Sequence, residues 1–187
     1  MMGHKIQPVN YRRKEKTNYR KRLRILVSRK TRIVIRRSST HIYVQAINYS
    51  PDGDKVLFTT SSKNLEKLGW KGGRKNIPTS YLTGLLAGKK AKEMGVKSAV
   101  LDIGLNPAIK GSKVFSVLTG LVDAGISIPH SEDVVEKNDR LSGSHIANHA
   151  KTAKKEKGEF SLYQKNNFPV ENFPKMFEEM KKKIMGM

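Results

Sequence analysis

Basic residues at the front of the chain are its most constraining feature. Ten of the twenty residues in YRRKEKTNYRKRLRILVSRK, positions 11–30, are Lys or Arg, and Glu15 is the only acid among them. Residues 1–40 contribute +13 of the chain's net charge of +21. Such a run is either a disordered basic tail or an element with a defined shape, and the positions of its apolar residues distinguish the two.

Those apolar residues have helical spacing. Four of them recur at i, i+4, i+7 and i+8 and therefore share one face of a helix: Tyr19, Leu23, Leu26 and Val27. Thr17 or Asn18 can cap the first turn. The pattern predicts a basic arm over residues 1–16 that leads into a short helix with arginine on its open faces.

The choice of arginine over lysine points to nucleic acid. Nine of the eleven arginines precede residue 40, whereas lysine is spread along the chain. A guanidinium binds phosphate through two parallel hydrogen bonds and stacks on bases, and a solubilising charge run has no need of either property. RNA is favoured over DNA because no DNA-reading helix motif is visible and tyrosines and His41 lie among the arginines as candidates for base stacking.

A group of β-branched runs follows the basic segment. Residues 32–37 and 41–47 are separated by Ser38-Ser39-Thr40, and residues 55–60 follow the turn sequence Ser50-Pro51-Asp52-Gly53. Three runs so close together predict an antiparallel meander.

Helical and strand patterns then alternate. A helix is expected from Pro78 to Met94, in which Gly84, Ala87, Gly88 and Ala91 suggest close packing against a sheet. SAVLDIG, residues 98–104, fits a buried strand, and a helix capped by Ser112 should run to Ala124. Near the C-terminus, residues 174–185 fit an amphipathic helix with Met176, Phe177, Met180 and Ile184 on one face.

These elements predict an α/β fold with a mixed β-sheet, an antiparallel meander and packed helices. We expect a basic N-terminal arm and helix over residues 1–30, an α/β core domain over 31–130 and a helical C-terminal extension over 131–187. No run of 18 apolar residues and no apolar leader segment is present, so we expect a cytoplasmic protein.

Catalytic and metal-binding patterns are weak. The chain has no cysteine, which excludes disulfides and thiolate sites. GLLAGKKA has the wrong glycine spacing for a phosphate-binding loop and lacks its Ser or Thr. HIANH lacks the Glu of a zinc protease, so RNA contact is a better interpretation of His145 and His149. Asp102 is the one carboxylate at the end of an expected strand, which leaves an RNA-processing enzyme as the competing class and a DNA-packaging protein as a third.

Two loops offer cations in a setting suited to RNA. GWKGGRKN supplies an indole for stacking, glycines that let the backbone approach phosphate, and three basic side chains. Trp70 could equally fill the core. In NPAIKGSKVF, Lys110 and Lys113 flank the start of a helix, where free N–H groups favour an anion.

The order of these segments resembles a known family. YRKRLRILVSRKTRIVIRRSSTHIYVQAI, GWKGGRKNIPTSYLTGLLAG and AVLDIGL are similar to the 5S-rRNA-binding protein of the large ribosomal subunit, the L-eighteen family in its archaeal form, whose eukaryotic relative is the large-subunit protein L-five. The resemblance covers about residues 11–150. One departure is Ile77, which stands before Pro78 where relatives often place a small polar residue.

The resemblance implies a structural protein, not an enzyme, that binds 5S rRNA in the central protuberance and helps join it to 23S rRNA and neighbouring ribosomal proteins, with no cofactor and no metal. It places RNA contacts on the N-terminal arm and helix, the sheet edge and the glycine-rich loop. With the residues chosen above, the predicted RNA-binding set is Arg12, Arg13, Lys14, Lys16, Tyr19, Arg20, Lys21, Arg22, Arg24, Arg29, Lys30, Arg32, Arg36, Arg37, His41, Trp70, Lys71, Arg74, Lys75, Lys110, Lys113, Arg140, His145 and His149.

Overall fold

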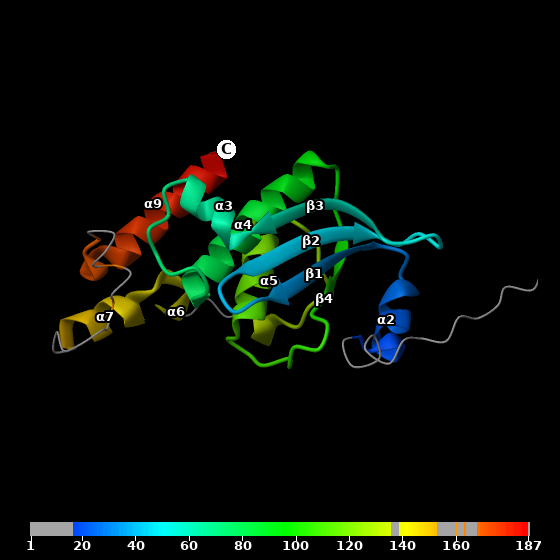
Figure 1. Cartoon of the computed structure of the whole chain (residues 1–187), viewed down its shortest axis with the longest axis horizontal. Helices are drawn as coiled ribbons and strands as arrows, with labels where there is room; N and C mark the ends of the chain where they lie inside the picture. The colour runs from blue at the N-terminus through cyan, green and yellow to red at the C-terminus, as the bar shows by residue number, and fades with distance from the viewer. Residues whose placement is uncertain (1–16, 136–138, 153–159, 161–162, 164–167, 187) are drawn as a thin grey trace, which may run out of the picture.

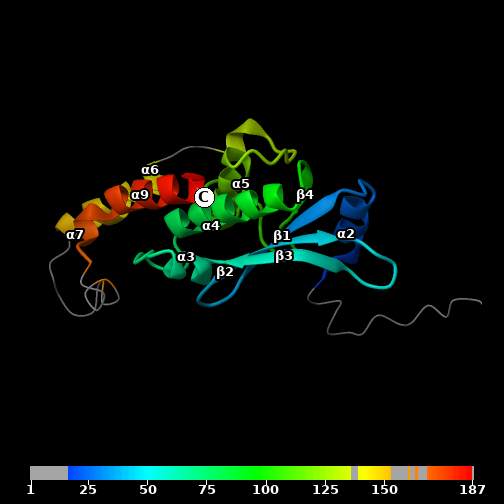
Figure 2. The same ribbon diagram turned by 90° about the horizontal axis from the view of Figure 1, so that it is seen from above.

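The computed structural model of the chain is built around one four-stranded mixed sheet with its two central helices on one face (Figures 1 and 2). It describes residues 17–135, 139–152, 160, 163 and 168–186. The expected basic arm, residues 1–16, lies outside the described residues. The predicted α/β fold with a mixed sheet is confirmed.

The strands and helices follow one another in an order that alternates after the third strand. The elements are α2 (Tyr19–Leu26), β1 (Thr31–Arg37), β2 (Ile42–Asn48), β3 (Lys55–Ser61), α3 (Ser62–Lys67), α4 (Ile77–Glu93), β4 (Ala99–Asp102), α5 (Lys113–Asp123), a 3₁₀ turn (Glu132–Val134), α6 (Asp139–Ser142), α7 (Ser144–Thr152), a second 3₁₀ turn (Val170–Asn172) and α9 (Phe173–Gly186). Among the helices of the described residues, none is long and apolar enough to cross a membrane.

The sheet has the strand order β3-β2-β1-β4. The first three strands pair antiparallel, which confirms the predicted meander, and β4 pairs parallel to β1 after the chain crosses through α4. Between β2 and β3 the chain turns at Gly53, whose φ of +143° only glycine adopts without strain. Its N–H donates a hydrogen bond to Ser50 O at 3.1 Å.

Alternation along β1 and β2 divides the sheet into two faces. Ile33, Ile35, Ile42 and Val44 point into the main core, where they pack against residues of α4 and α5. The intervening residues of both strands point to the opposite face, which α4 and α5 leave open (Figure 2). The sheet therefore has a buried face that supplies stability and a second face available for other contacts.

The two central helices approach each other through glycine. A Cβ on Gly84 of α4 would lie 2.2 Å from Val117 O, and a Cβ on Gly120 of α5 would lie 2.2 Å from Tyr81 O. The expectation that Gly84 and Gly88 pack against a sheet was wrong, because their partner is α5; Ala87 and Ala91 do join the core beneath the sheet. Small residues at these positions let the helix backbones touch.

The helix ends follow the expected capping only in part. The predicted start of α2 is confirmed by Asn18, whose side chain accepts a hydrogen bond from Lys21 N at 3.0 Å. Asn76 caps α4 by accepting from Thr79 N, so Ile77 before the proline does not disturb the helix start. Ser112 stands before α5, but its hydroxyl is buried without a hydrogen-bond partner, so the expected side-chain cap was wrong.

The C-terminal helix closes a second apolar cluster. Phe177, Met180 and Ile184 of α9 are buried against α4, as their helical spacing predicted, and Met176 is partly buried beside them. Trp70 lies in the same cluster and meets Phe173 edge to face at 5.5 Å. Residues far apart in sequence thus hold the loop before α4 against the last helix.

We expect Gly84→Ala to destabilise the fold by about 1–3 kcal/mol, because the added methyl would overpack the contact between α4 and α5. Helix propensity alone would make alanine more stable than glycine here by about 0.5–1 kcal/mol. We therefore expect Gly84→Ala to destabilise the protein where the same substitution in most helices stabilises it. Urea unfolding measures the difference. Gly186→Ala is the matched control, because a Cβ there meets nothing within 4 Å. Equal stability of Gly84→Ala and the parent would show that the two helices have room to spare.

Candidate nucleic-acid interface

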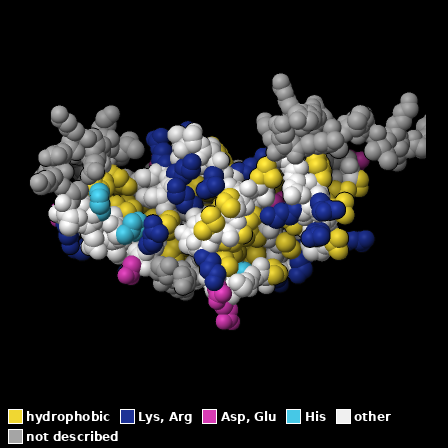
Figure 3. All heavy atoms as spheres, turned by 90° about the horizontal axis from the view of Figure 1, so that it is seen from below, with side chains coloured by type: hydrophobic (Ala, Val, Ile, Leu, Met, Phe, Trp, Pro, Cys, Tyr) yellow, Lys and Arg dark blue, Asp and Glu magenta, His cyan; other side chains and the backbone are white. Residues whose placement is uncertain are grey.

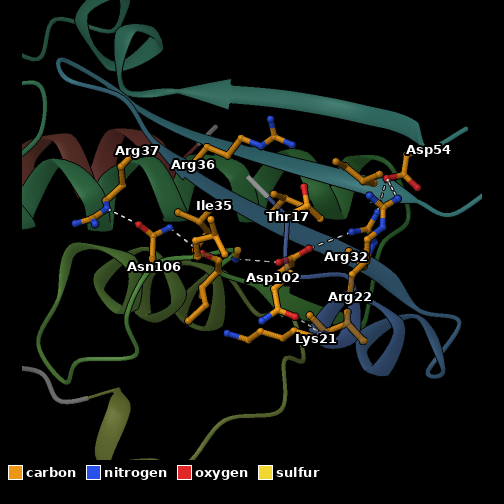
Figure 4. Close-up of a pocket in the computed structure, with 17 residues that line it drawn as sticks. Thr17, Lys21, Arg22, Arg32, Ile35, Arg36, Arg37, Asp54, Asp102 and Asn106 are labelled. Atoms are coloured by element: carbon orange, nitrogen blue, oxygen red, sulfur yellow. Dashed lines mark hydrogen bonds and ion pairs between the residues drawn. The ribbon is translucent and has the colours of Figure 1, made fainter. Parts of the chain in front are cut away.

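Helix α2 lies over one end of the open sheet face and encloses a groove of about 420 Å³ with it (Figure 4). Lys21, Arg22 and Ile25 line the groove from the helix, and Arg32 and Arg36 line it from β1. The alternation of β1 puts Arg32 and Arg36 on the face opposite Ile33 and Ile35. The groove thus brings together cations that the sequence placed in two separate segments.

A chain of ion pairs crosses the groove. Arg32 Nη2 lies 2.6 Å from Asp54 Oδ2 and Arg32 Nη1 lies 3.0 Å from Asp102 Oδ2, and Asp54 also accepts from Arg22 Nη2 at 2.8 Å. Figure 4 shows both arginines turned toward Asp54 from different elements. The chain therefore ties α2 to the turn before β3, to β1 and to the end of β4.

Arg32 is a structural residue, which corrects its predicted role. Its side chain is only 3% exposed, so a phosphate cannot reach it. A buried guanidinium is stable only when carboxylates compensate its lost hydration, and Asp54 and Asp102 supply this compensation. Asp102 also accepts a hydrogen bond from Gly104 N at 2.9 Å. The carboxylate considered for metal-assisted RNA cleavage is thus used to hold Arg32.

Other cations of the groove remain uncompensated. Lys21 and Arg36 form no ion pair with any described residue, and Arg37 donates from Nε to the neutral Asn106 Oδ1 at 2.9 Å. Arg36 stands opposite Tyr43 of β2, and the ring of Tyr43 meets His41 edge to face at 6.3 Å. Exposed cations beside aromatic rings can bind phosphate and stack on bases together.

The outer surface of α2 and the segment after it add further cations. Arg20, Arg24, Arg29 and Lys30 are exposed, and none is paired with an acid in the described part of the chain. Arg29 has a φ of +51°, a left-handed conformation that turns the chain from α2 into β1. The remaining predicted residues of this segment, Arg12, Arg13, Lys14 and Lys16, lie outside the described residues.

The glycine-rich loop is held from inside by Trp70. Its indole is 3% exposed and donates from Nε1 to Thr79 Oγ1 at 3.0 Å, so the prediction that it stacks on RNA was wrong. Gly72 lies against the ring, where a Cβ would come within 2.5 Å of it. Gly73 N donates to the Tyr163 hydroxyl at 2.9 Å. These contacts make the loop a fixed platform for its basic side chains.

The cations of this loop differ in their surroundings. Lys71 is exposed, whereas Arg74 pairs with Glu66 at 2.5 Å on the surface. Lys75 Nζ donates to Ser39 O at 3.3 Å, beside the turn between β1 and β2. The loop therefore reaches the end of β1 where Arg37 lies.

A second set of cations surrounds the start of α5. Partial burial lowers the pKa of Lys113, and the neighbouring positive charges of Lys75 and Arg37 lower it further. Lys113, Lys75 and Arg37 thus come close together from three segments, and none of them forms an ion pair with a described acid, which favours an anion at this point. Lys110 differs, because it forms an exposed ion pair with Asp133 at 2.9 Å. Such pairs contribute little and exchange readily.

Arg140, His145 and His149 lie apart from these groups. They belong to α6 and α7, at the end of the molecule opposite α2 (Figure 1). Burial lowers the pKa of His145, and Arg140 lowers it further, while His149 lies beside Phe160 with ring centres 5.8 Å apart. No group of three His, Asp or Glu side chains within the described part of the chain could hold a metal ion.

The surface seen from below shows how unevenly charge is distributed. Lys and Arg side chains gather over the middle of the molecule and at the α2 end, and acidic side chains occupy only a few places (Figure 3). A surface of this kind attracts a polyanion over a distance of about 8–10 Å at physiological salt.

Sequence reasoning missed two of the residues that shape this surface. Asp54 was not selected, because the compensation of Arg32 by an acid 22 residues away has no local pattern. Tyr49, which follows β2 and is exposed, was not selected as a candidate. No arginine lies within ten residues of it, so the signal that selected His41, an aromatic ring close to arginines, is absent at Tyr49.

Comparisons with known proteins agree with the motifs. A family model described as ribosomal large subunit proteins 60S L5 and 50S L18 matches residues 5–98 and 89–131. The chain is 43% identical over 175 residues to the large ribosomal subunit protein uL18 of Methanothermobacter thermautotrophicus, a match that covers 92% of this chain and 91% of that protein. These matches confirm the resemblance drawn from the sequence.

We expect Asp54→Asn to loosen α2 and to lower the free energy of unfolding by about 1–3 kcal/mol, because buried Arg32 loses one of its two carboxylates. Amide hydrogen exchange in α2 should speed up, which mass spectrometry measures. Asp52→Asn is the matched control, since it makes the same charge change in the same turn and Asp52 forms no ion pair with a described residue. Unchanged exchange in α2 would mean that the ion pairs do not hold the helix.

Proposed function

The chain belongs to the family of large-subunit ribosomal proteins that contains 60S L5 and 50S L18, and from this membership we propose that it binds 5S rRNA and helps attach it to 23S rRNA in the central protuberance. Membership makes the chain a structural protein of the large ribosomal subunit rather than an enzyme. As a ribosomal protein it works in the cytoplasm, with rRNA and other ribosomal proteins as partners.

The observation that supports the RNA-binding proposal best is the groove between α2 and the open sheet face. Its acids, Asp54 and Asp102, are committed to Arg32 and Arg22, so Lys21 and Arg36 are left to external anions. Binding a phosphate to such a cation releases the counterions condensed on RNA, which supplies affinity without sequence preference.

Selectivity then has to come from shape. The packed α/β core holds the end of β1, the loop of residues 69–76 and the start of α5 in fixed relation, because Trp70 and Tyr163 anchor that loop. Rigidly spaced cations match the phosphates of one folded RNA better than those of a uniform duplex. We propose that the arm of residues 1–16 adds contacts to the same RNA.

A competition shift assay tests the proposal: labelled 5S rRNA is bound to the full-length protein and displaced by tRNA or by duplex DNA. We expect unlabelled 5S rRNA to displace the labelled RNA at a far lower concentration than tRNA or duplex DNA does. Equal displacement by duplex DNA would favour a DNA-packaging role, and shortening of the labelled RNA in Mg²⁺ would favour a nuclease.

We also expect a steep dependence on salt. If about six to ten phosphates are neutralised, the affinity for 5S rRNA falls about 10³- to 10⁵-fold between 50 and 200 mM salt. A form lacking residues 1–30 should keep its cooperative unfolding, because the core cluster contains no residue of that segment. The same form should bind with a shallower salt slope and lower affinity. Filter binding at several salt concentrations measures both quantities, and a slope near zero for the full-length protein would contradict the mechanism.

A further inference from the structure

Helix α2 turns its apolar face away from the protein. Leu23 is 69% exposed and Val27 is 76% exposed, although their spacing with Tyr19 is that of a helix face meant for burial. The side of α2 that meets the sheet is instead the one with Arg22 and Ile25. An apolar face that the fold itself leaves uncovered indicates a contact with another molecule.

This face forms one wall of a second groove, of about 730 Å³, which shares no lining residue with the groove of Figure 4. Leu23 and Val27 lie on one side, and Tyr49, 57% exposed, lies on the other. Arg29 and Lys30 also line it, together with Leu26, Thr31 and Asn48. The volume is within the range of about 300–1,000 Å³ typical of ligand sites. Figure 3 shows apolar and basic side chains interleaved at this end of the molecule.

Charge limits what can occupy the groove. Its charged lining residues are cations only, Arg29 and Lys30. Residues 1–16 of the same chain carry five Lys and Arg against Glu15, and a second copy carries +21, so both are repelled. The favoured occupant has flat apolar surfaces and negative charge side by side. Unpaired RNA bases with their phosphates have both properties.

We propose that this groove binds unpaired nucleobases of ribosomal RNA, with Tyr49 stacking on a base, Leu23 and Val27 covering base or ribose faces, and Arg29 and Lys30 on the flanking phosphates. The inference rests on the proposed function and adds a site whose contribution is apolar. The free energy of stacking on an aromatic ring changes little with salt, whereas each phosphate contact weakens as the salt concentration rises. The two kinds of contact can therefore be measured separately.

The test compares variants of the full-length protein in filter binding to 5S rRNA and, separately, to protein-free 23S rRNA at several salt concentrations. Tyr49→Ala should weaken binding to one of the two RNAs about 5- to 100-fold and leave the salt dependence of that affinity unchanged. Leu23→Gln should weaken binding to the same RNA, again with no change in its salt dependence. Arg29→Gln should instead reduce the slope for that RNA by about 0.7–0.9. Met94→Gln is the matched control, because Met94 is 60% exposed at the end of α4.

Tyr49 and Leu23 lie on the surface, so thermal unfolding of each variant should match the parent and exclude misfolding as the cause. Parent-like affinity of Tyr49→Ala and Leu23→Gln for both RNAs would overturn the inference and would point to a protein as the occupant of the groove. A change in salt slope with Tyr49→Ala would also overturn it. Failure of the parent protein to prefer 5S rRNA over tRNA would refute the proposed function instead, which keeps the two failures distinct.

Discussion

The open face of the sheet depends on one buried cation. Arg32 sits on that face, almost fully buried, with Asp54 on one side and Asp102 on the other. Because a guanidinium out of water is costly without compensation, these three side chains must lie together whenever the sheet is formed. Asp54 extends the constraint to Arg22, so that the position of α2 is set by charge and not mainly by apolar burial.

This arrangement separates the arginines into two groups with different tasks. Arg22 and Arg32 stabilise the fold: Arg32 bridges Asp54 and Asp102, and Arg22 pairs with Asp54 alone. Arg20, Arg24 and Arg36 carry no such partner among the described residues. The acids of this region lie where they orient the basic helix, and they leave its outward cations free to bind an external anion.

The sequence predicted the elements better than their contacts. The β-branched runs around Ile33 and Val44 and the helical spacing of Phe177 with Ile184 carry their own periodicity, so the meander and the last helix were predicted correctly. The partner of Gly84 could not be predicted, because a small residue indicates close approach without saying to what. Trp70 and Arg32 are of types that bind RNA when exposed, and only tertiary packing puts both inside.

The apolar face of α2 is exposed although its helical spacing suggests burial, and this has a physical explanation that links fold and function. An apolar face buried against the sheet would have fixed the helix by the hydrophobic effect and left its arginines outward on all remaining sides. Anchoring through Arg22 and Asp54 instead leaves Leu23 and Val27 in solvent beside cations. Exposed aliphatic groups lower solubility when they stand alone, but here a dense positive charge keeps copies of the chain apart. A bound polyanion reduces that repulsion, so we expect the apolar face to serve as a contact surface once RNA is bound.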